Sequence, residues 1–171
     1  LAQGEDIKAR YTKLFKVYLL VEEKPYRMEL NRTRLYPGGY RSYFSVPEDG
    51  VEVEHELVLV NDAVLQTVRV IRNPKKKALR LRISWHEYTG LNPAGRTWGK
   101  WQASLARHAW MRKITDETSK KTRGETWFGI VAELPMTTKL TRSGRRFFET
   151  APFRSGATTV TSLFAPDKAA F

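Results

Sequence analysis

The strongest constraint on the fold is a regular alternation of apolar and polar residues within residues 64–88. In the second half of this stretch the apolar side chains occupy every second position, namely Leu79, Leu81, Ile83 and Trp85. A period of two is typical of a β-strand with one buried face and one polar face. Residues 64–72 show a similar pattern, and a lysine-rich segment separates the two runs. We therefore expect two strands joined by a turn with lysines at its tip.

Turn-forming residues divide the preceding segment into further strands. Residues 36–40 contain Pro-Gly-Gly, residues 47–50 read Pro-Glu-Asp-Gly, and Asn61-Asp62 can form a two-residue hairpin turn. The segments between these turns, residues 41–46 and 51–60, are predicted as strands. If Val60 pairs with Ala63, the remaining opposite pairs are Val53 with Val70, Leu59 with Val64, Glu54 with Arg69, and Glu56 with Thr67.

The same reasoning extends to a third strand. A four-residue loop at residues 73–76 would place Val70 opposite Leu79, Val68 opposite Leu81, and Arg69 opposite Arg80. The three strands would then share one continuous apolar face, which a shift of one residue would scatter across both faces. The sequence therefore predicts a three-stranded meander.

The rest of the chain predicts more strands and two helical segments. Helical spacing of apolar residues favours a helix within residues 7–22 that runs into a strand, and helix formers favour a second helix over residues 101–114. Residues 89–99 and 115–124 are expected to be a loop and an exposed connection. Further strands are predicted at residues 126–134, 147–150 and 158–164, with a hairpin turn at residues 142–145. The predicted fold is mainly β (β-rich α+β), with two antiparallel β layers and one or two helical segments.

The charge is strongly positive and unevenly distributed. The 30 Lys and Arg residues exceed the 18 Asp and Glu residues, for a formal net charge of +12. Residues 1–60 carry nine basic and ten acidic side chains, whereas residues 61–171 carry twenty-one and eight. This balance favours a polyanionic partner such as RNA, DNA or anionic lipid. We divide the chain into an N-terminal helix/strand arm (1–40), a β-rich core domain (41–164) and a C-terminal tail (165–171).

The sequence offers no catalytic motif and no metal site. There is no cysteine, and His55, His86 and His108 lack metal-ligand spacing. His86 and Glu87 are neighbours on a predicted strand, so they point to opposite faces and would not act on one substrate. The glycines lack the pattern of a phosphate-binding loop, and Ser143 lacks a nucleophile-elbow context. We expect a protein without enzymatic activity or cofactor.

Clustered cations and tryptophans are the candidate binding residues. Three groups of basic residues lie on predicted turns or connections: Arg72, Lys75, Lys76 and Lys77; Lys120, Lys121 and Arg123; Arg142, Arg145 and Arg146. Long cationic side chains on turns can reach phosphate backbones, although they can also serve solubility alone. Four tryptophans are interleaved with further cations: Trp98, Trp101, Trp110 and Trp127. They could stack on unpaired bases, or pack in the core and in protein interfaces, which we favour.

The order of the predicted elements, with Val68-Arg69-Val70-Ile71-Arg72 leading into a charged turn, resembles the Whirly family of single-stranded nucleic-acid-binding proteins and the related kinetoplastid guide-RNA annealing factors. The resemblance covers residues 41–164. It implies a single-stranded nucleic acid as the partner. The chain lacks the Lys-Gly-Lys-Ala-Ala-Leu motif associated with the family, so no functional residue is transferred.

Together these features predict an RNA-associated structural subunit of a large ribonucleoprotein, such as a mitochondrial ribosome, in contact with neighbouring protein subunits. The alternatives are an accessory subunit of a membrane-bound respiratory or ATP synthase assembly in contact with anionic lipid, a Whirly-like protein, and a viral coat protein. No apolar run approaches the ~20 residues of a transmembrane helix. The chain begins at Leu1 rather than Met, which fits a cleaved organellar presequence or missing preceding residues. An organellar (mitochondrial matrix) location is therefore expected.

Overall fold

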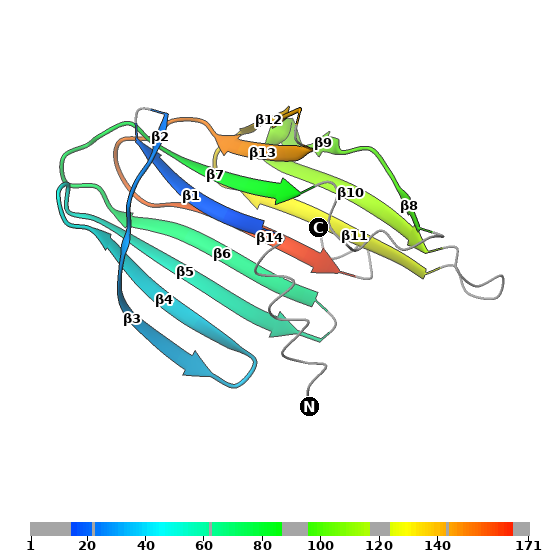
Figure 1. Cartoon of the computed structure of the whole chain (residues 1–171), viewed down its shortest axis with the longest axis horizontal. Coiled ribbons are helices and arrows are strands. Elements are labelled where there is room, and N and C mark those ends of the chain that lie inside the picture. Colours follow the sequence, from blue (N-terminus) through cyan, green and yellow to red (C-terminus); the bar gives the residue numbers. More distant parts are fainter. Residues whose placement is uncertain are drawn as a thin grey trace.

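The computed structural model describes residues 15–21, 23–61, 63–86, 96–116, 124–142 and 144–165. Across these residues the strands form two antiparallel sheets (Figure 1). The large sheet has the order β3 (Glu29–Tyr36), β4 (Gly39–Val46), β5 (Val51–Val60), β6 (Ala63–Arg72), β14 (Thr158–Ala165), β11 (Gly124–Ala132), β10 (Ala109–Asp116) and β8 (Arg96–Trp98), and β9 (Gln102–Ser104) also pairs with β10. The small sheet has the order β12 (Met136–Leu140), β13 (Arg145–Thr150), β7 (Leu79–His86), β1 (Phe15–Val21) and β2 (Lys24–Pro25). The prediction of a mainly β fold with two antiparallel layers is confirmed.

The predicted register between β5 and β6 is confirmed in every pair that was specified. Val60 pairs with Ala63, Val53 with Val70, Leu59 with Val64, Glu54 with Arg69, and Glu56 with Thr67. Asn61 has a φ of 51°, the left-handed conformation that a tight hairpin turn requires and that Asn tolerates. Alternation on both strands and a short turn together determined this pairing.

The predicted pairing of β6 with β7 is wrong. β6 pairs with β14 on the side away from β5, whereas β7 pairs with β1 and β13 in the small sheet. The lysine-rich segment between β6 and β7 therefore connects the two sheets, and the apolar faces of these strands meet across the core rather than side by side. Arg69 and Arg80 are consequently not neighbours in one sheet.

One hydrophobic core fills the space between the sheets. The small sheet contributes Leu19, Leu81, Ile83, Trp85 and Phe148, and the large sheet contributes Val53, Val68, Val70, Phe128, Ile130 and Val160. The rings of Trp85 and Phe128 lie with their centroids 4.9 Å apart and join the two layers directly. On β7, and over much of β5 and β6, apolar side chains alternate with polar ones, so these strands bury one face in the core and present the other outward.

The helix predicted over residues 101–114 is wrong. This stretch contains β9, a short 3-10 turn (Leu105–Arg107) and β10. Ala106 and Arg107 have positive φ angles of 51° and 73°, which end any right-handed helix. β10 pairs along its whole length with β11, so tertiary pairing overrides the helix propensity of the alanines and leucine in residues 101–114. Of the helix predicted within residues 7–22, Phe15–Val21 is strand β1, and residues 7–14 lie outside the described residues.

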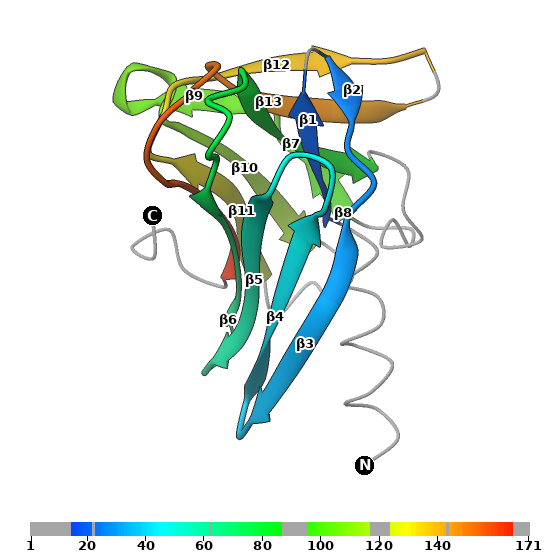
Figure 2. The same cartoon turned by 90° about the vertical axis from the view of Figure 1, so that its left-hand side faces the viewer.

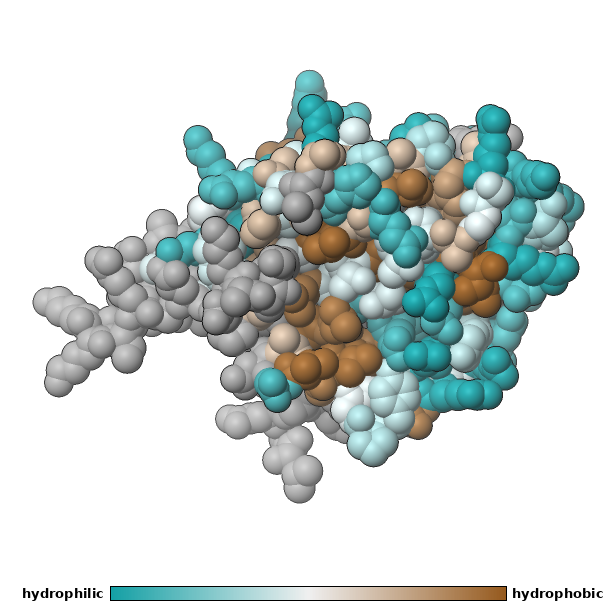
Figure 3. All heavy atoms as spheres, turned by 180° about the vertical axis from the view of Figure 1, so that it is seen from behind, coloured by the Kyte–Doolittle hydropathy of each residue, from teal (hydrophilic) through white to brown (hydrophobic). Residues whose placement is uncertain are grey.

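The large sheet is wider than the small one. β3, β4 and β5 extend beyond the small sheet as a projecting part of the large sheet (Figures 1 and 2). Leu30 and Leu35 of β3 are accordingly 59% and 82% exposed. The view from behind shows hydrophobic side chains gathered near the middle of that side, with hydrophilic ones over much of the remainder (Figure 3). Among the described residues, no helix has the length and apolar content to cross a membrane.

Candidate functional site

The predicted cationic tip between β6 and β7 is largely neutralised by acidic partners. Arg72 Nη1 lies 3.0 Å from Glu52 Oε1, while Lys75 Nζ and Lys77 Nζ lie 3.1 Å and 3.0 Å from the two carboxylate oxygens of Asp49. Lys76 is exposed and forms no ion pair with any described residue. Glu52 lies opposite Arg72 in the register of β5 and β6. Asp49 comes from the turn between β4 and β5.

Asp49 connects three segments of the chain. Its side chain is 7% exposed. In addition to its ion pairs with Lys75 and Lys77, it accepts a hydrogen bond from the Tyr26 hydroxyl. The hydrogen bond from Tyr26, followed by that from Lys77, lowers the pKa of Asp49 to about 2. The arrangement stabilises the loops at this end of the sandwich and keeps the carboxylate ionised.

The predicted basic group of Arg142, Arg145 and Arg146 does not join this tip. Arg142 is exposed in the turn between β12 and β13, Arg145 begins β13, and Arg146 donates from Nη1 to Thr138 Oγ1 at 3.3 Å. Arg145 pairs with His86 at the end of β7, whereas the lysine tip precedes the start of β7, so the two groups lie at opposite ends of this strand. Lys120, Lys121 and Arg123 lie outside the described residues.

Two of the four tryptophans pack within the protein. Trp101 contacts Phe148 and Trp85, with ring centroids 4.7 Å and 6.1 Å away, and Trp110 Nε1 donates to the Met136 carbonyl at 3.3 Å. Trp127 is half-buried on β11, and Trp98 lies in β8, where its side chain is outside the described part. The geometry of Trp101 and Trp110 therefore favours packing, the alternative preferred from the sequence.

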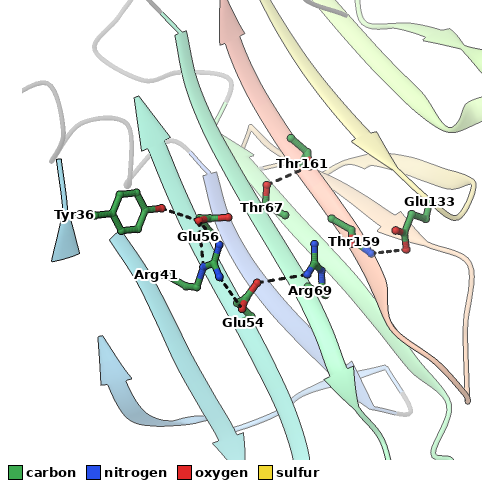
Figure 4. Close-up of polar contacts among 9 residues, drawn as sticks. All are labelled: Tyr36, Arg41, Glu54, Glu56, Thr67, Arg69, Glu133, Thr159 and Thr161. Atoms are coloured by element: carbon green, nitrogen blue, oxygen red, sulfur yellow. Dashed lines mark hydrogen bonds and ion pairs between the residues drawn. The ribbon is translucent and has the colours of Figure 1, made fainter. Parts of the chain in front are cut away.

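A ladder of charged residues crosses the outer face of the large sheet (Figure 4). Glu56 Oε1 accepts hydrogen bonds from Arg41 Nη2 and the Tyr36 hydroxyl, both at 2.7 Å. Glu54 lies 3.7 Å from Arg41 and from Arg69. These contacts, led by the hydrogen bond from Tyr36, lower the pKa of Glu56, while burial and Glu56 raise the pKa of Tyr36 to about 12. Glu54 and Glu56 face the same way, and the lowered pKa of Glu56 makes it unsuited to donate a proton near neutral pH.

The two described histidine side chains are partly buried and bonded to their neighbours. His55 Nε2 lies 2.8 Å from Gln66 Nε2, and its ring meets Tyr40 edge-on; burial lowers the pKa of His55. His108 Nδ1 lies 3.2 Å from the Ala132 carbonyl oxygen. Within the described residues, no three His, Asp or Glu side chains converge as metal ligands.

A pocket of about 450 Å³ lies at the end of the sandwich where β7 begins, and its lining residues are Glu23, Ala78, Arg80, Pro152, Phe153 and Arg154. Arg80 Nε lies 3.2 Å from Glu23 Oε1, and the Glu23 side chain is 62% exposed. Arg154 is exposed and forms no ion pair within the described part of the chain. The pocket thus combines one carboxylate, two guanidinium groups and an apolar wall.

The pocket wall is held in place by backbone and side-chain contacts. Leu79 and Phe153 exchange two backbone hydrogen bonds of 2.9 Å, and Phe153 packs against the core. Asn73 Nδ2 donates to the carbonyl oxygens of Arg154 at 3.0 Å and Lys77 at 2.8 Å. The site is therefore preformed. The sequence did not indicate it, because its residues come from three distant segments without a shared spacing.

Comparison with known proteins identifies the fold. No family model matches the sequence, and no curated protein matches it. A solved structure of a protein named kojibiose phosphorylase, from the human microbiome, matches with a TM-score of 0.53 and 9% identity, covering 88% of this chain and 21% of that chain. A GH36 α-galactosidase from Geobacillus stearothermophilus is also similar, with a TM-score of 0.49 and 12% identity, and the match covers 87% of this chain and 29% of that chain. A GH92 inverting mannosidase from Bacteroides thetaiotaomicron VPI-5482 has a TM-score of 0.49 and 12% identity, and the match covers 91% of this chain and 22% of that chain. The chain spans less than a third of the length of these proteins.

These comparisons contradict the function predicted from sequence. The structure with the matching fold carries the name of a carbohydrate-active enzyme rather than that of a ribosomal or other RNA-binding protein. The predicted RNA-associated ribonucleoprotein subunit is therefore corrected, together with the respiratory-assembly, Whirly-like and viral-coat alternatives. The organellar location stays a prediction. At 9% identity the likeness establishes a shared fold, a two-layered antiparallel β architecture that also occurs as part of longer proteins.

Proposed function

We propose that this chain is a non-catalytic β-sandwich module that binds carbohydrate. The observation that carries the proposal is the preformed pocket at the start of β7. Its volume of about 450 Å³ lies within the roughly 300–1,000 Å³ that is usual for small-molecule sites. Glu23 can accept hydrogen bonds from sugar hydroxyls, Arg80 and Arg154 can donate them, and the side chains of Pro152 and Phe153 offer apolar contact to the C–H face of a sugar ring.

The number and pairing of the carboxylates support a binding role without chemistry. Glycoside hydrolysis ordinarily needs two carboxyl groups, one of which has a raised pKa and donates a proton. Glu23 is the one carboxylate that lines the pocket, and it is paired with Arg80. Elsewhere in the described residues Asp49 and Glu56 have lowered pKa values, and Glu149 lies 2.5 Å from Arg82 Nη2.

The likeness to the kojibiose phosphorylase adds a reason to choose carbohydrate among the small polar ligands that could fill such a pocket. The match covers 21% of that protein, so a sandwich of this kind can be one part of a longer carbohydrate-active chain. The likeness concerns the fold, and the ligand is our inference from the pocket.

The proposal can be tested by native affinity electrophoresis of the full chain in gels containing neutral or acidic polysaccharides. We expect at least one polysaccharide to retard the protein, Glu23→Ala to reduce the retardation, and no reducing ends to be released. Glu48→Ala is the matched control, because Glu48 is also exposed but lies outside the pocket lining. Migration unaffected by every polysaccharide would contradict carbohydrate binding, and release of reducing ends would contradict a non-catalytic role.

A further inference from the structure

The charges around the pocket are unequal. Glu23 and Arg80 lie 3.2 Å apart and compensate each other, whereas Arg154 has no ionic partner within the described residues. The lining therefore carries one positive charge that is not neutralised by its neighbours. An exposed guanidinium on the rim of a pocket provides a site for one negative charge.

The chemistry of Arg154 favours a carboxylate. A guanidinium presents parallel N–H donors that match the two oxygens of a carboxylate, and such charge-assisted pairs are the stronger hydrogen bonds. The pocket also lies mainly in the basic part of the chain, since residues 61–171 carry twenty-one basic and eight acidic side chains. This surplus raises the local concentration of anions.

The rest of the lining calls for more than a small inorganic anion. The pocket volume of about 450 Å³ and the apolar surface of Ala78, Pro152 and Phe153 would be poorly used by sulfate or acetate. The Glu23–Arg80 pair offers one acceptor group and one donor group to neighbouring hydroxyls. A ligand with one carboxylate, several hydroxyls and one apolar face satisfies all three parts of the lining.

We infer that the pocket binds an acidic sugar of the hexuronate type, with its carboxylate on Arg154 and its hydroxyls on Glu23 and Arg80. This inference rests on the proposed carbohydrate-binding function and specifies the class of sugar. Glu23 also repels a second negative charge, so a singly charged sugar is preferred over a multiply charged one.

The inference is tested by NMR titration of the isotope-labelled full chain at low salt, following the amides of residues 78–80 and 153–154. The probes are sodium glucuronate, glucose, sodium acetate and sodium sulfate. Glucuronate should bind at least about tenfold more tightly than each of the other three, as expected for one added charge-assisted contact or for the added hydroxyl contacts.

Two substitutions of Arg154 separate charge from geometry. Arg154→Gln should weaken glucuronate binding by about tenfold or more, and Arg154→Lys should give an intermediate loss because it keeps the charge without the planar fork. Arg142→Gln removes the same charge at the opposite end of β7 and should change binding by less than about twofold. Arg154 is exposed, so these variants are expected to fold, which far-UV circular dichroism will verify.

The inference would be overturned if glucose, acetate or sulfate bound as tightly as glucuronate. It would also be overturned if Arg154→Gln left glucuronate binding unchanged. A protein that is retarded by a neutral polysaccharide but does not prefer glucuronate would retain the proposed function and lose this inference. Conversely, binding of glucuronate at these amides without retardation by any polysaccharide would contradict a polysaccharide-binding module while leaving the acidic-sugar pocket in place.

Discussion

At the scale of single residues, Asp49 shows how an acidic side chain outside the strands determines what a basic cluster can do. The lysines that precede β7 were predicted to contact a polyanion because they cluster on a turn in the basic part of the chain. In the structure Lys75 and Lys77 instead form ion pairs with Asp49, which also accepts a hydrogen bond from the Tyr26 hydroxyl. The cluster therefore contributes to holding three loops together, and less of its charge is available to a partner.

Replacing Asp49 by Asn should destabilise the protein in a pH-dependent way. The pKa of Asp49 is lowered from 3.8 to about 2 in the folded chain, so its contribution to stability is fully present above pH 4 and is lost as the pH falls toward 2. We expect Asp49→Asn to lower the melting temperature by several degrees at pH 7 and by much less at pH 2. Thermal unfolding followed by circular dichroism measures both values.

The adjacent Glu48 provides the control for this prediction. It is exposed, and its backbone carbonyl rather than its carboxylate contacts Lys75. Glu48→Gln should leave the melting temperature almost unchanged at either pH. A deficit of Asp49→Asn that is equally large at pH 2 and pH 7 would show that packing, and not the charge of Asp49, is responsible.

At the scale of elements, alternation predicts which face of a strand is buried but not which strand lies beside it. It located β5, β6 and β7, and the short turn that begins at Asn61 fixed the β5–β6 register. The partner of β6 on its other side is β14, which follows it by more than eighty residues and left no local signal. The longer connection after Arg72 allows the chain to cross to the other sheet. The alternation of β7 would be the same whether it paired with β6 or lay in the other sheet.

The helix predicted over residues 101–114 failed for a related reason. Its alanines and leucine favour a helix, but β10 gains a full set of hydrogen bonds to β11, a partner that the sequence does not indicate. The pocket was missed because Glu23, Arg80 and Arg154 come from segments that are distant in sequence and meet only when β1, β7 and β13 are assembled in the small sheet. Properties set by neighbours in sequence were predictable here, and properties set by distant pairing were not.

The pairing of β7 can be tested with cysteines, since the chain has none of its own. Arg82 and Glu149 are directly opposite on β7 and β13, with their charged groups 2.5 Å apart. The double variant R82C/E149C should form a disulfide on mild oxidation and gain about 2–4 kcal/mol of stability relative to its reduced form. Non-reducing electrophoresis and urea unfolding provide the two measurements.

The matched comparison is R69C/R80C, the pair that a β6–β7 hairpin would place opposite each other. These positions lie in different sheets, and packed sheets are about 10 Å apart, too far for the ~4.4–6.8 Å between Cα atoms that a disulfide requires. The two cysteines of R69C/R80C should therefore form no disulfide with each other within one chain. Efficient cross-linking of R69C/R80C together with failure of R82C/E149C would restore the hairpin and overturn the observed topology.

At the scale of the whole molecule, the two sheets share one core to which residues 15–40 contribute. β1 lies between β7 and β2 in the small sheet, and β3 forms an edge of the large sheet. Leu19 of β1 is 1% exposed and pairs with Leu81. Because the core is continuous between the layers, we expect the sheets to unfold together.

Leu19→Ala tests this cooperativity. Loss of a fully buried leucine should lower the free energy of unfolding by about 2–5 kcal/mol, and the amides of β5–β6 and of β7–β13 should lose the same protection against hydrogen exchange. Leu35→Ala is the matched control within residues 15–40, because Leu35 is 82% exposed and its loss should cost less than about 0.5 kcal/mol. Loss of protection confined to β7–β13 would mean that the sheets unfold separately, and a Leu19→Ala effect as small as that of Leu35→Ala would place β1 outside the common core.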